Sequence, residues 1–197
     1  MQRNEFLIRI RNLVISLAIF VALVLYASTY SVPVLRVSLM PDESPPVLRR
    51  KLKPLTDYLE KKIGMKIEFR PVSDGNALVE ALLSHKLDMV WIDGLNLARA
   101  KSRSNDQVIP LVQREEGEKT PSVFITTPGY NDYTWTVRAD MDVNLRQKLT
   151  DAFLALDKNN GQDKEILDLQ RASKFIPASA ENRSVIEAAA RRAWLLK

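Results

Sequence analysis

Three strand-like apolar segments separated by single amphipathic helices constrain the fold of this 197-residue chain more than any other feature. The segments span residues 34–39, 65–72 and 87–92. The second alternates apolar with charged residues, which is typical of a strand with one buried face. Strands joined by single helices pair in parallel through right-handed crossovers, so the pattern predicts an open α/β sheet. Ligands of such sheets bind at the carboxyl ends of the strands.

The helices are predicted from the spacing of their apolar residues. Pro45–Ile63 repeats leucine every three or four residues, and Gly64 then ends the helix. The next helix begins after an N-cap at Ser73 or Asp74 and ends near His85. Further strands are expected at residues 107–113, 121–127 and 133–138, and further helices at 142–156, 162–172 and 181–196, with Phe175-Ile176-Pro177 separating the last two.

The motifs PDES, PLVQRE, SVFITT, TWTVRADMD and LDLQRASKFIP carry a family resemblance. Residues 34–127 resemble the first lobe of the phosphate, phosphite and phosphonate class of periplasmic substrate-binding proteins, especially the selenate-transporter branch. Residues 128–196 resemble the return of the chain to that lobe, and the segment that builds the second lobe is missing between residues 127 and 130. Pro128-Gly129 is a turn signal that would close this gap as a hairpin.

The resemblance implies an α/β fold, as a single lobe of a type II periplasmic binding protein. We expect a mixed, mainly parallel sheet with flanking helices, preceded by an N-terminal hydrophobic helix. Residues 1–33 are interpreted as a signal peptide or membrane anchor, and residues 34–197 as the solute-binding-protein-like lobe.

The N-terminal segment predicts export. Residues 13–27 carry no charge and follow Arg3, Arg9 and Arg11, which favours insertion with the N-terminus in the cytoplasm. The apolar run is shorter than the roughly 20 residues of a spanning helix unless residues up to 34 join it, and no good cleavage site follows it. Two alternatives stay open: a cleaved peptide, giving a periplasmic or secreted protein, and an inner-membrane anchor through residues 13–34.

Three loops at strand ends are the predicted ligand site, because each precedes a helix whose N-terminus favours an oxyanion. The candidate ligand-binding residues are Pro41, Asp42, Glu43, Ser44, Ser73, Asp74, Trp91, Asp93 and Gly94. The plain alternative for Ser44 and Asp74 is helix capping. In the family the second lobe presses on the ligand from the other side, and here that lobe is missing.

Two residues depart from the family pattern. Gly75 stands where an aromatic residue, often tyrosine, is common, and Asp93 stands where glycine is common. The carboxylate of Asp93 would repel an anion. A cation or an amine would be better received by Asp42, Glu43 and Asp93, unless these carboxylates only cap helices and face water.

Several functions are disfavoured. The chain has no cysteine, and its single histidine, His85, lacks catalytic companions. Neither a phosphate-binding glycine loop nor metal-ligand spacing occurs, so no enzyme activity, metal or cofactor is predicted. The net charge of +5 is spread among alternating basic and acidic residues, which does not favour nucleic-acid binding.

The three tryptophans, Trp91, Trp135 and Trp194, are expected in the core or hinge. Trp135 and Tyr133 are the exception, because loss of the second lobe would expose them as a partner surface.

Two functions follow as hypotheses. The first is a periplasmic component of an ABC importer for a small oxyanion of the selenate or phosphonate type, with weakened binding. The alternative is a membrane-anchored interaction or regulatory module that binds an ABC permease, a sensor or a second copy of itself. A product without any role is the third possibility.

Overall fold

The computed structural model describes residues 11–22, 33–115 and 133–178. The chain divides into two compact units, Met1–Pro33 and Val34–Lys197. In the first unit, residues 11–22 form a helix that overlaps the apolar run at residues 13–27. No helix in the described ranges combines the length and the apolarity that crossing a membrane requires. The anchor and the cleaved peptide therefore stay predictions.

Three further predictions lie outside the described residues. They are the strand at 121–127, the turn at Pro128-Gly129 and the helix at 181–196, which includes Trp194. The deletion expected between residues 127 and 130 lies there too.

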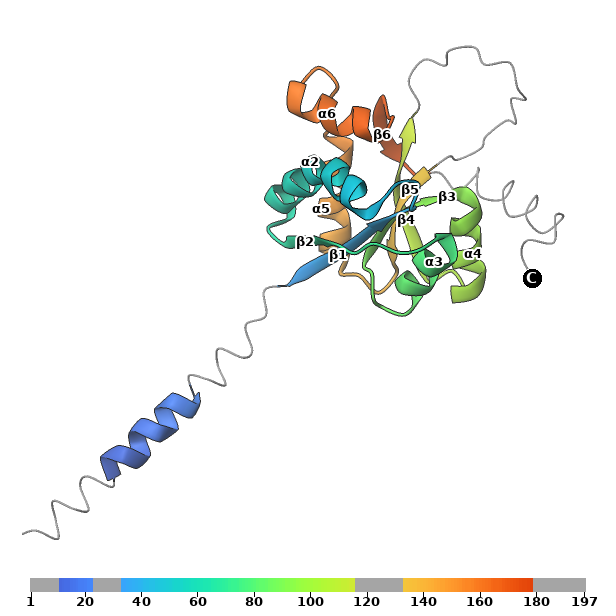
Figure 1. Cartoon of the computed structure of the whole chain (residues 1–197). Helices are drawn as coiled ribbons and strands as arrows, with labels where there is room; N and C mark the ends of the chain where they lie inside the picture. The colour runs from blue at the N-terminus through green and yellow to red at the C-terminus, as the bar shows by residue number, and fades with distance from the viewer. Residues whose placement is uncertain (1–10, 23–32, 116–132, 179–197) are drawn as a thin grey trace, which may run out of the picture. The chain divides into compact units, whose positions relative to one another are not determined.

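The predicted parallel unit is present in the second body of the chain (Figure 1). β1 (Val34–Leu39) lies between β2 (Lys66–Phe69) and β3 (Met89–Asp93), and both pairings are parallel. α2 (Pro45–Ile63) and α3 (Gly75–Leu83) form the two connections. Gly64 ends α2 in the left-handed conformation, with φ 71°, and its N–H donates to the Glu60 carbonyl at 2.9 Å. Glycine adopts this cap at no steric cost, which confirms the predicted stop.

The rest of the described chain adds strands of both directions. After α4 (Gly94–Ser104) come β4 (Val108–Glu115), β5 (Tyr133–Arg138), α5 (Val143–Leu154), α6 (Gly161–Leu169) and β6 (Lys174–Pro177). The sheet has six strands in the order β2-β1-β3-β5-β4-β6. β5 is antiparallel to both β3 and β4, and β6 is antiparallel to β4.

Two expectations are therefore corrected. Of the five pairings between described strands, two are parallel and three antiparallel, so the sheet is mixed and not mainly parallel. The reason is that β5 runs between β3 and β4 against both. Residues 175–177 are part of an edge strand and not a linker between helices. Phe175 is 3% exposed, so its burial against the core accompanies the pairing of β6 with β4.

The helices cover both faces of the sheet (Figure 1). α2, α5 and α6 share one apolar cluster with one face, and α3 and α4 share a second cluster with the other. β3 shows the division, because Met89 and Trp91 belong to the first cluster and Val90 and Ile92 to the second. This alternation is the period of two that a strand buried on both faces must have.

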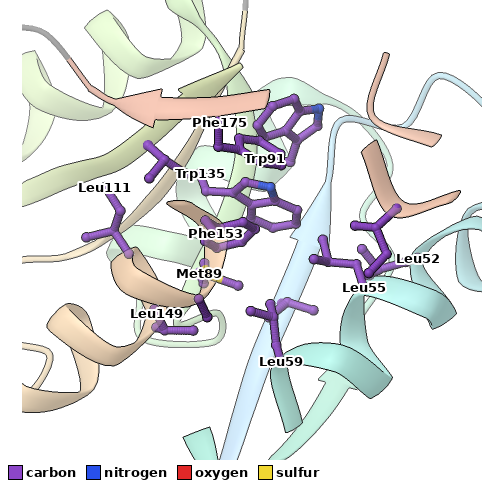
Figure 2. Close-up of a cluster of buried hydrophobic side chains, with 14 of the residues drawn as sticks. Leu52, Leu55, Leu59, Met89, Trp91, Leu111, Trp135, Leu149, Phe153 and Phe175 are labelled. Atoms are coloured by element: carbon purple, nitrogen blue, oxygen red, sulfur yellow. The ribbon is translucent and has the colours of Figure 1, made fainter. Parts of the chain in front are cut away.

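Aromatic rings fill the centre of the first cluster (Figure 2). Trp135 is fully buried and stacks on Phe153 with 5.5 Å between ring centroids. Trp91 lies 5.3 Å from Trp135 and meets Phe175 edge to face at 6.0 Å. The prediction that Trp135 is exposed is wrong, because α5 and β6 cover this part of the sheet. The prediction of core packing is confirmed for Trp91 and Trp135.

A buried carboxylate connects strands at the end of the sheet where the parallel strands begin, opposite to the end that leads into the three predicted loops. Asp88, just before β3, accepts from Arg36 Nε at 2.7 Å and Nη2 at 2.7 Å, and from Arg138 Nη1 at 2.8 Å. Burial by itself would raise the pKa of Asp88, but these bonds and the Arg36 backbone N–H outweigh it and hold that pKa below its usual value. The network joins β1, β3 and β5 where the parallel strands begin.

Candidate functional site

The three predicted loops meet at one edge of the sheet, because β1, β2 and β3 are parallel and end on the same side. The Met40 N–H donates to the Trp91 carbonyl at 3.2 Å, which ties the first loop to the third. The Asn96 side chain, in α4, lies against Gly75, which ties the second loop to the third. The fold therefore brings the three predicted loops together.

The first loop leaves α2 without free amide donors at its start. The prolines at 45 and 46 have no N–H, and the amides of Val47 and Leu48 donate to the Ser44 carbonyl at 2.9 and 3.0 Å. The Ser44 hydroxyl makes no capping bond, so the side-chain capping considered for it is absent.

The remaining residues of the first loop, Pro41, Asp42 and Glu43, are half-buried or exposed. Glu43 pairs with Lys51 of α2 at 2.6 Å, in partial contact with solvent. Such a pair contributes little to stability. It partly neutralises the carboxylate that a cationic ligand would need.

The second loop caps α3 with a carboxylate. Asp74 Oδ1 accepts from the Ala77 N–H at 2.8 Å, and the Ser73 hydroxyl donates to Asp74 Oδ2 at 3.0 Å. The amide of Ala77, followed by the hydroxyl of Ser73, lowers the pKa of Asp74. The capping role considered for Asp74 is confirmed, and it places negative charge at the N-terminus of α3.

The third loop caps α4 in the same way. Asp93 is half-buried, and its Oδ1 accepts from the Asn96 N–H at 3.0 Å. Gly94, the first residue of α4, is buried. Trp91 is 8% exposed and stacks on Tyr133 with a centroid distance of 5.4 Å. The Trp91 ring is therefore packed in the core beneath the third loop and is not exposed for a ligand to stack on it.

Asn96 is the residue of this edge that sequence reasoning missed. Its side chain is 6% exposed, and its Nδ2 donates to Asp93 Oδ2 at 2.6 Å and approaches Met40 Sδ at 3.7 Å. Its Oδ1 accepts from Arg99 at 3.2 Å. The spacing Asp-x-x-Asn at a helix start resembles a capping box, and this was the available signal.

Gly75 has no room for a side chain. A Cβ built on Gly75 would lie 2.7 Å from Asn96 Nδ2 and 3.1 Å from its Cγ and Oδ1. Asn96 thus occupies the space beside Gly75 and is held there by Asp93 and Arg99. The side chain of Asn96 thus contacts both positions at which a departure from the family pattern is expected, Gly75 and Asp93.

Tyr133 and Arg114 border this edge on the far side of β3. Tyr133 lies opposite Asp93 in the β3–β5 pairing, and the Arg114 guanidinium lies 5.2 Å from its ring centroid. Arg114 Nη1 also donates to the Gln170 carbonyl at 3.1 Å. Tyr133 is half-buried between Arg114 and Trp91, so the exposure predicted for it is partial.

Other concavities lie away from this edge. A cavity of about 430 Å³ lies between α2 and α6, with Arg50, Tyr58 and Asp163 among its walls. A second, of about 360 Å³, includes His85, Arg103 and Arg138. His85 is exposed and lies 3.4 Å from Asp140, as expected for a surface histidine. Within the described parts of the chain, no group of acidic or histidine side chains could hold a metal.

Comparison with known proteins identifies the family. A family model described as "ABC transporter, phosphonate, periplasmic substrate-binding protein" matches residues 37–130 and 119–182. The chain belongs to this family. Its homologues are transporter substrate-binding proteins, which are not enzymes.

Among curated proteins, the chain is similar to the probable ABC transporter phosphite binding protein PhnD1 of Prochlorococcus marinus (strain MIT 9301). The two are 27% identical over 92 residues, which is 47% of this chain and 31% of the relative. The match thus spans about a third of the length of that relative.

Solved structures share the fold. The structure of PhnD1 from Prochlorococcus marinus with methylphosphonate has a TM-score of 0.71 at 17% identity, covering 83% of this chain and 99% of that one. A binding-protein component of an ABC phosphonate transporter from Pseudomonas aeruginosa (PA3383) has a TM-score of 0.69 at 11% identity, with 84% and 89% covered. At these identities the similarity establishes the α/β fold and does not identify a ligand.

Proposed function

We propose that this protein is a periplasmic component of an ABC importer for a small oxyanion of the phosphonate or selenate type, and that it captures that oxyanion weakly. Membership in the phosphonate-binding family supports the ligand class. The selenate branch is supported only by the resemblance of the sequence motifs.

The observation that carries weak capture is that the chain's own groups already occupy part of each of the three helix N-termini. α2 begins with two prolines, and its next two amides donate to the Ser44 carbonyl. α3 and α4 are each capped by an aspartate of the chain, Asp74 and Asp93. At α3 and α4 an oxyanion would meet a carboxylate that already holds one N-terminal amide, and at α2 it would find no N–H on the first two residues. It would therefore gain less than an uncapped helix N-terminus supplies.

A missing second lobe would weaken binding further. We place the missing segment between residues 127 and 130, within the overlap of the two ranges that the family model matches, residues 37–130 and 119–182. If a complete clamp binds near micromolar, at about −8 kcal/mol, the loss of half its contacts leaves about −4 kcal/mol, or millimolar affinity. One lobe cannot remove most of the water from a small anion.

The internal caps also favour a second candidate, a module that has lost ligand capture altogether. In this case the protein would be anchored to the inner membrane through residues 13–34 and would bind an ABC permease, a sensor or another copy of itself. The half-buried stack of Arg114 on Tyr133 at the edge of the sheet is the surface we assign to such a partner.

Isothermal titration of the purified full chain in mild detergent distinguishes the two candidates. The ligands are selenate, selenite, phosphate, phosphite and methylphosphonate. A dissociation constant between about 100 μM and 10 mM, or about −5.5 to −2.7 kcal/mol, for one of them supports weak capture. No heat with any ligand up to 10 mM supports the interaction module, and affinity tighter than about 100 μM refutes both.

The fate of the N-terminal segment has its own test. Intact mass of the protein recovered from the cell envelope gives the full chain if the segment is an anchor. A mass that lacks about 30 residues would contradict the anchor and indicate cleavage.

A further inference from the structure

We propose that Asp93 and Asn96 determine the charge of the ligand that this edge of the sheet accepts, with Asp93 excluding anions and Asn96 holding its carboxylate in place. This inference rests on the proposed function, because it explains weak oxyanion capture by two named side chains. Neither residue is a ligand contact in this proposal.

Asp93 is fixed more firmly than an ordinary cap. Its Oδ1 accepts from the Asn96 N–H at 3.0 Å, and its Oδ2 accepts from Asn96 Nδ2 at 2.6 Å. Both oxygens therefore point toward the first turn of α4, where helix geometry would otherwise favour an anionic ligand. The carboxylate cannot swing away to make room without breaking both bonds.

Asn96 is itself held by several contacts. Arg99 donates to its Oδ1 at 3.2 Å, Met40 Sδ lies 3.7 Å from its Nδ2, and the side chain is 6% exposed. Its tip presses against Gly75, where a built Cβ would approach within 2.7 Å. The side chain therefore joins the starts of α3 and α4 and fills the space between them. Asn96 positions the charge, and Asp93 supplies it.

The charge on Asp93 has a direct consequence for specificity. An anion near the α4 N-terminus meets a carboxylate that already uses the Asn96 amide, so attraction to the helix is replaced by repulsion. The repulsion grows with the charge of the ligand. A dianion such as selenate is therefore excluded more strongly than a monoanion such as nitrate.

The test compares Asp93→Asn with a matched control, Asp142→Asn, in the full chain. Asparagine is as good an N-cap as aspartate, so the bond from the Asn96 N–H is kept while the charge and the bond from Asn96 Nδ2 are lost. Asp142 caps α5 through the Leu145 N–H at 2.9 Å and follows the end of β5, which lies at the opposite edge of the sheet from the three loops. The control loses the same charge and keeps the same kind of cap.

Titration with selenate and with nitrate gives the readout. We expect Asp93→Asn to bind selenate at least about tenfold more tightly than the unmodified chain, with a smaller gain for nitrate, and Asp142→Asn to change neither. An equal gain in both variants would show that net charge alone acts, and an unchanged affinity in Asp93→Asn would also overturn the proposal.

Two further variants protect the test. If Asp93→Asn does not fold, Asp93→Ser supplies a neutral cap at the same position. Asn96→Ala keeps the charge of Asp93 but removes one of the two bonds that hold its carboxylate, so we expect a smaller gain of selenate affinity than in Asp93→Asn. A gain as large as that of Asp93→Asn would contradict the role of the charge, and no gain would contradict the positioning role of Asn96. If the unmodified chain binds selenate tighter than about 100 μM, weak capture fails as the proposed function. The comparison of the two asparagine variants still decides this inference.

Discussion

Substitution of Gly75 by alanine tests the contact between the starts of α3 and α4. The added Cβ would lie 2.7 Å from Asn96 Nδ2 and 3.1 Å from Asn96 Cγ and Oδ1, where ordinary contacts need roughly 3.5–4 Å. Asn96 cannot move freely, because Asp93 and Arg99 both bond its side chain. The overlap must be relieved by breaking one of these bonds or by shifting a helix.

The expected cost follows from these contacts. Overpacking in a fixed environment costs about 1–3 kcal/mol, and loss of one hydrogen bond to a charged group lies in the same range, so we expect Gly75→Ala to destabilise by about 2 kcal/mol. In an Asn96→Ala background the overlap is gone. The same substitution should then be neutral or stabilising by up to about 1 kcal/mol, because alanine restricts the unfolded chain and favours helix.

The assay is urea unfolding of the full chain in mild detergent, followed by tryptophan fluorescence. It compares the unmodified chain, Gly75→Ala, Asn96→Ala and the double variant. Gly161→Ala is the matched control, because Gly161 is also the first residue of a helix and a Cβ there would meet nothing within 4 Å. The control should be neutral or slightly stabilising. If Gly75→Ala costs the same with and without Asn96, the two residues are not coupled and the contact is not the cause.

Three further predictions concern the frame that holds this edge. Asp88→Asn should destabilise by about 3 kcal/mol at pH 7, because two arginines would lose their buried partner. The pKa of Asp88 is lower in the folded than in the unfolded protein, so the stability that its charge contributes is complete above the unfolded pKa of about 4 and is lost as pH falls through the folded value. The urea midpoints of the unmodified protein and of Asp88→Asn should therefore converge at acid pH. A difference that does not change with pH would contradict the role of the charge. Trp135→Ala should cost about 3–5 kcal/mol, since the ring is fully buried, and a loss below about 1 kcal/mol by the same assay would show that the aromatic cluster is not central. Tyr58→Phe should destabilise by about 1 kcal/mol, because the Tyr58 hydroxyl donates to the Ala152 carbonyl at 2.7 Å and joins α2 to α5. An unchanged urea midpoint would show that this hydrogen bond contributes no more than the bond to water that replaces it in the unfolded chain.

Local patterns predicted the first half of the sheet-forming domain well. The leucine spacing and Gly64 gave α2 its observed bounds, and the alternation of β3 agrees with its two buried faces. The second half was less predictable. Phe175 belongs to a segment too short to show a period, and only the open edge of β4 beside the aromatic cluster makes it a strand.

The candidate site divides in the same manner. Asp74 and Asp93 are recognisable as caps from their place before a helix. Asn96 is not recognisable as a lock on Gly75, because the two residues are 21 positions apart and meet only when α3 and α4 pack together.

The sequence by itself determined the parallel strand–helix unit, its family and the residues placed at the strand ends, because these depend on local periodicity and on motifs a few residues long. Only the tertiary structure decided the mixed sheet, the burial of Trp135 and the contacts of Asn96 with Gly75 and Asp93 that join the starts of α3 and α4. These features depend on which distant side chains share a small space, and the free energy of such contacts is fixed by packing and not by any local preference.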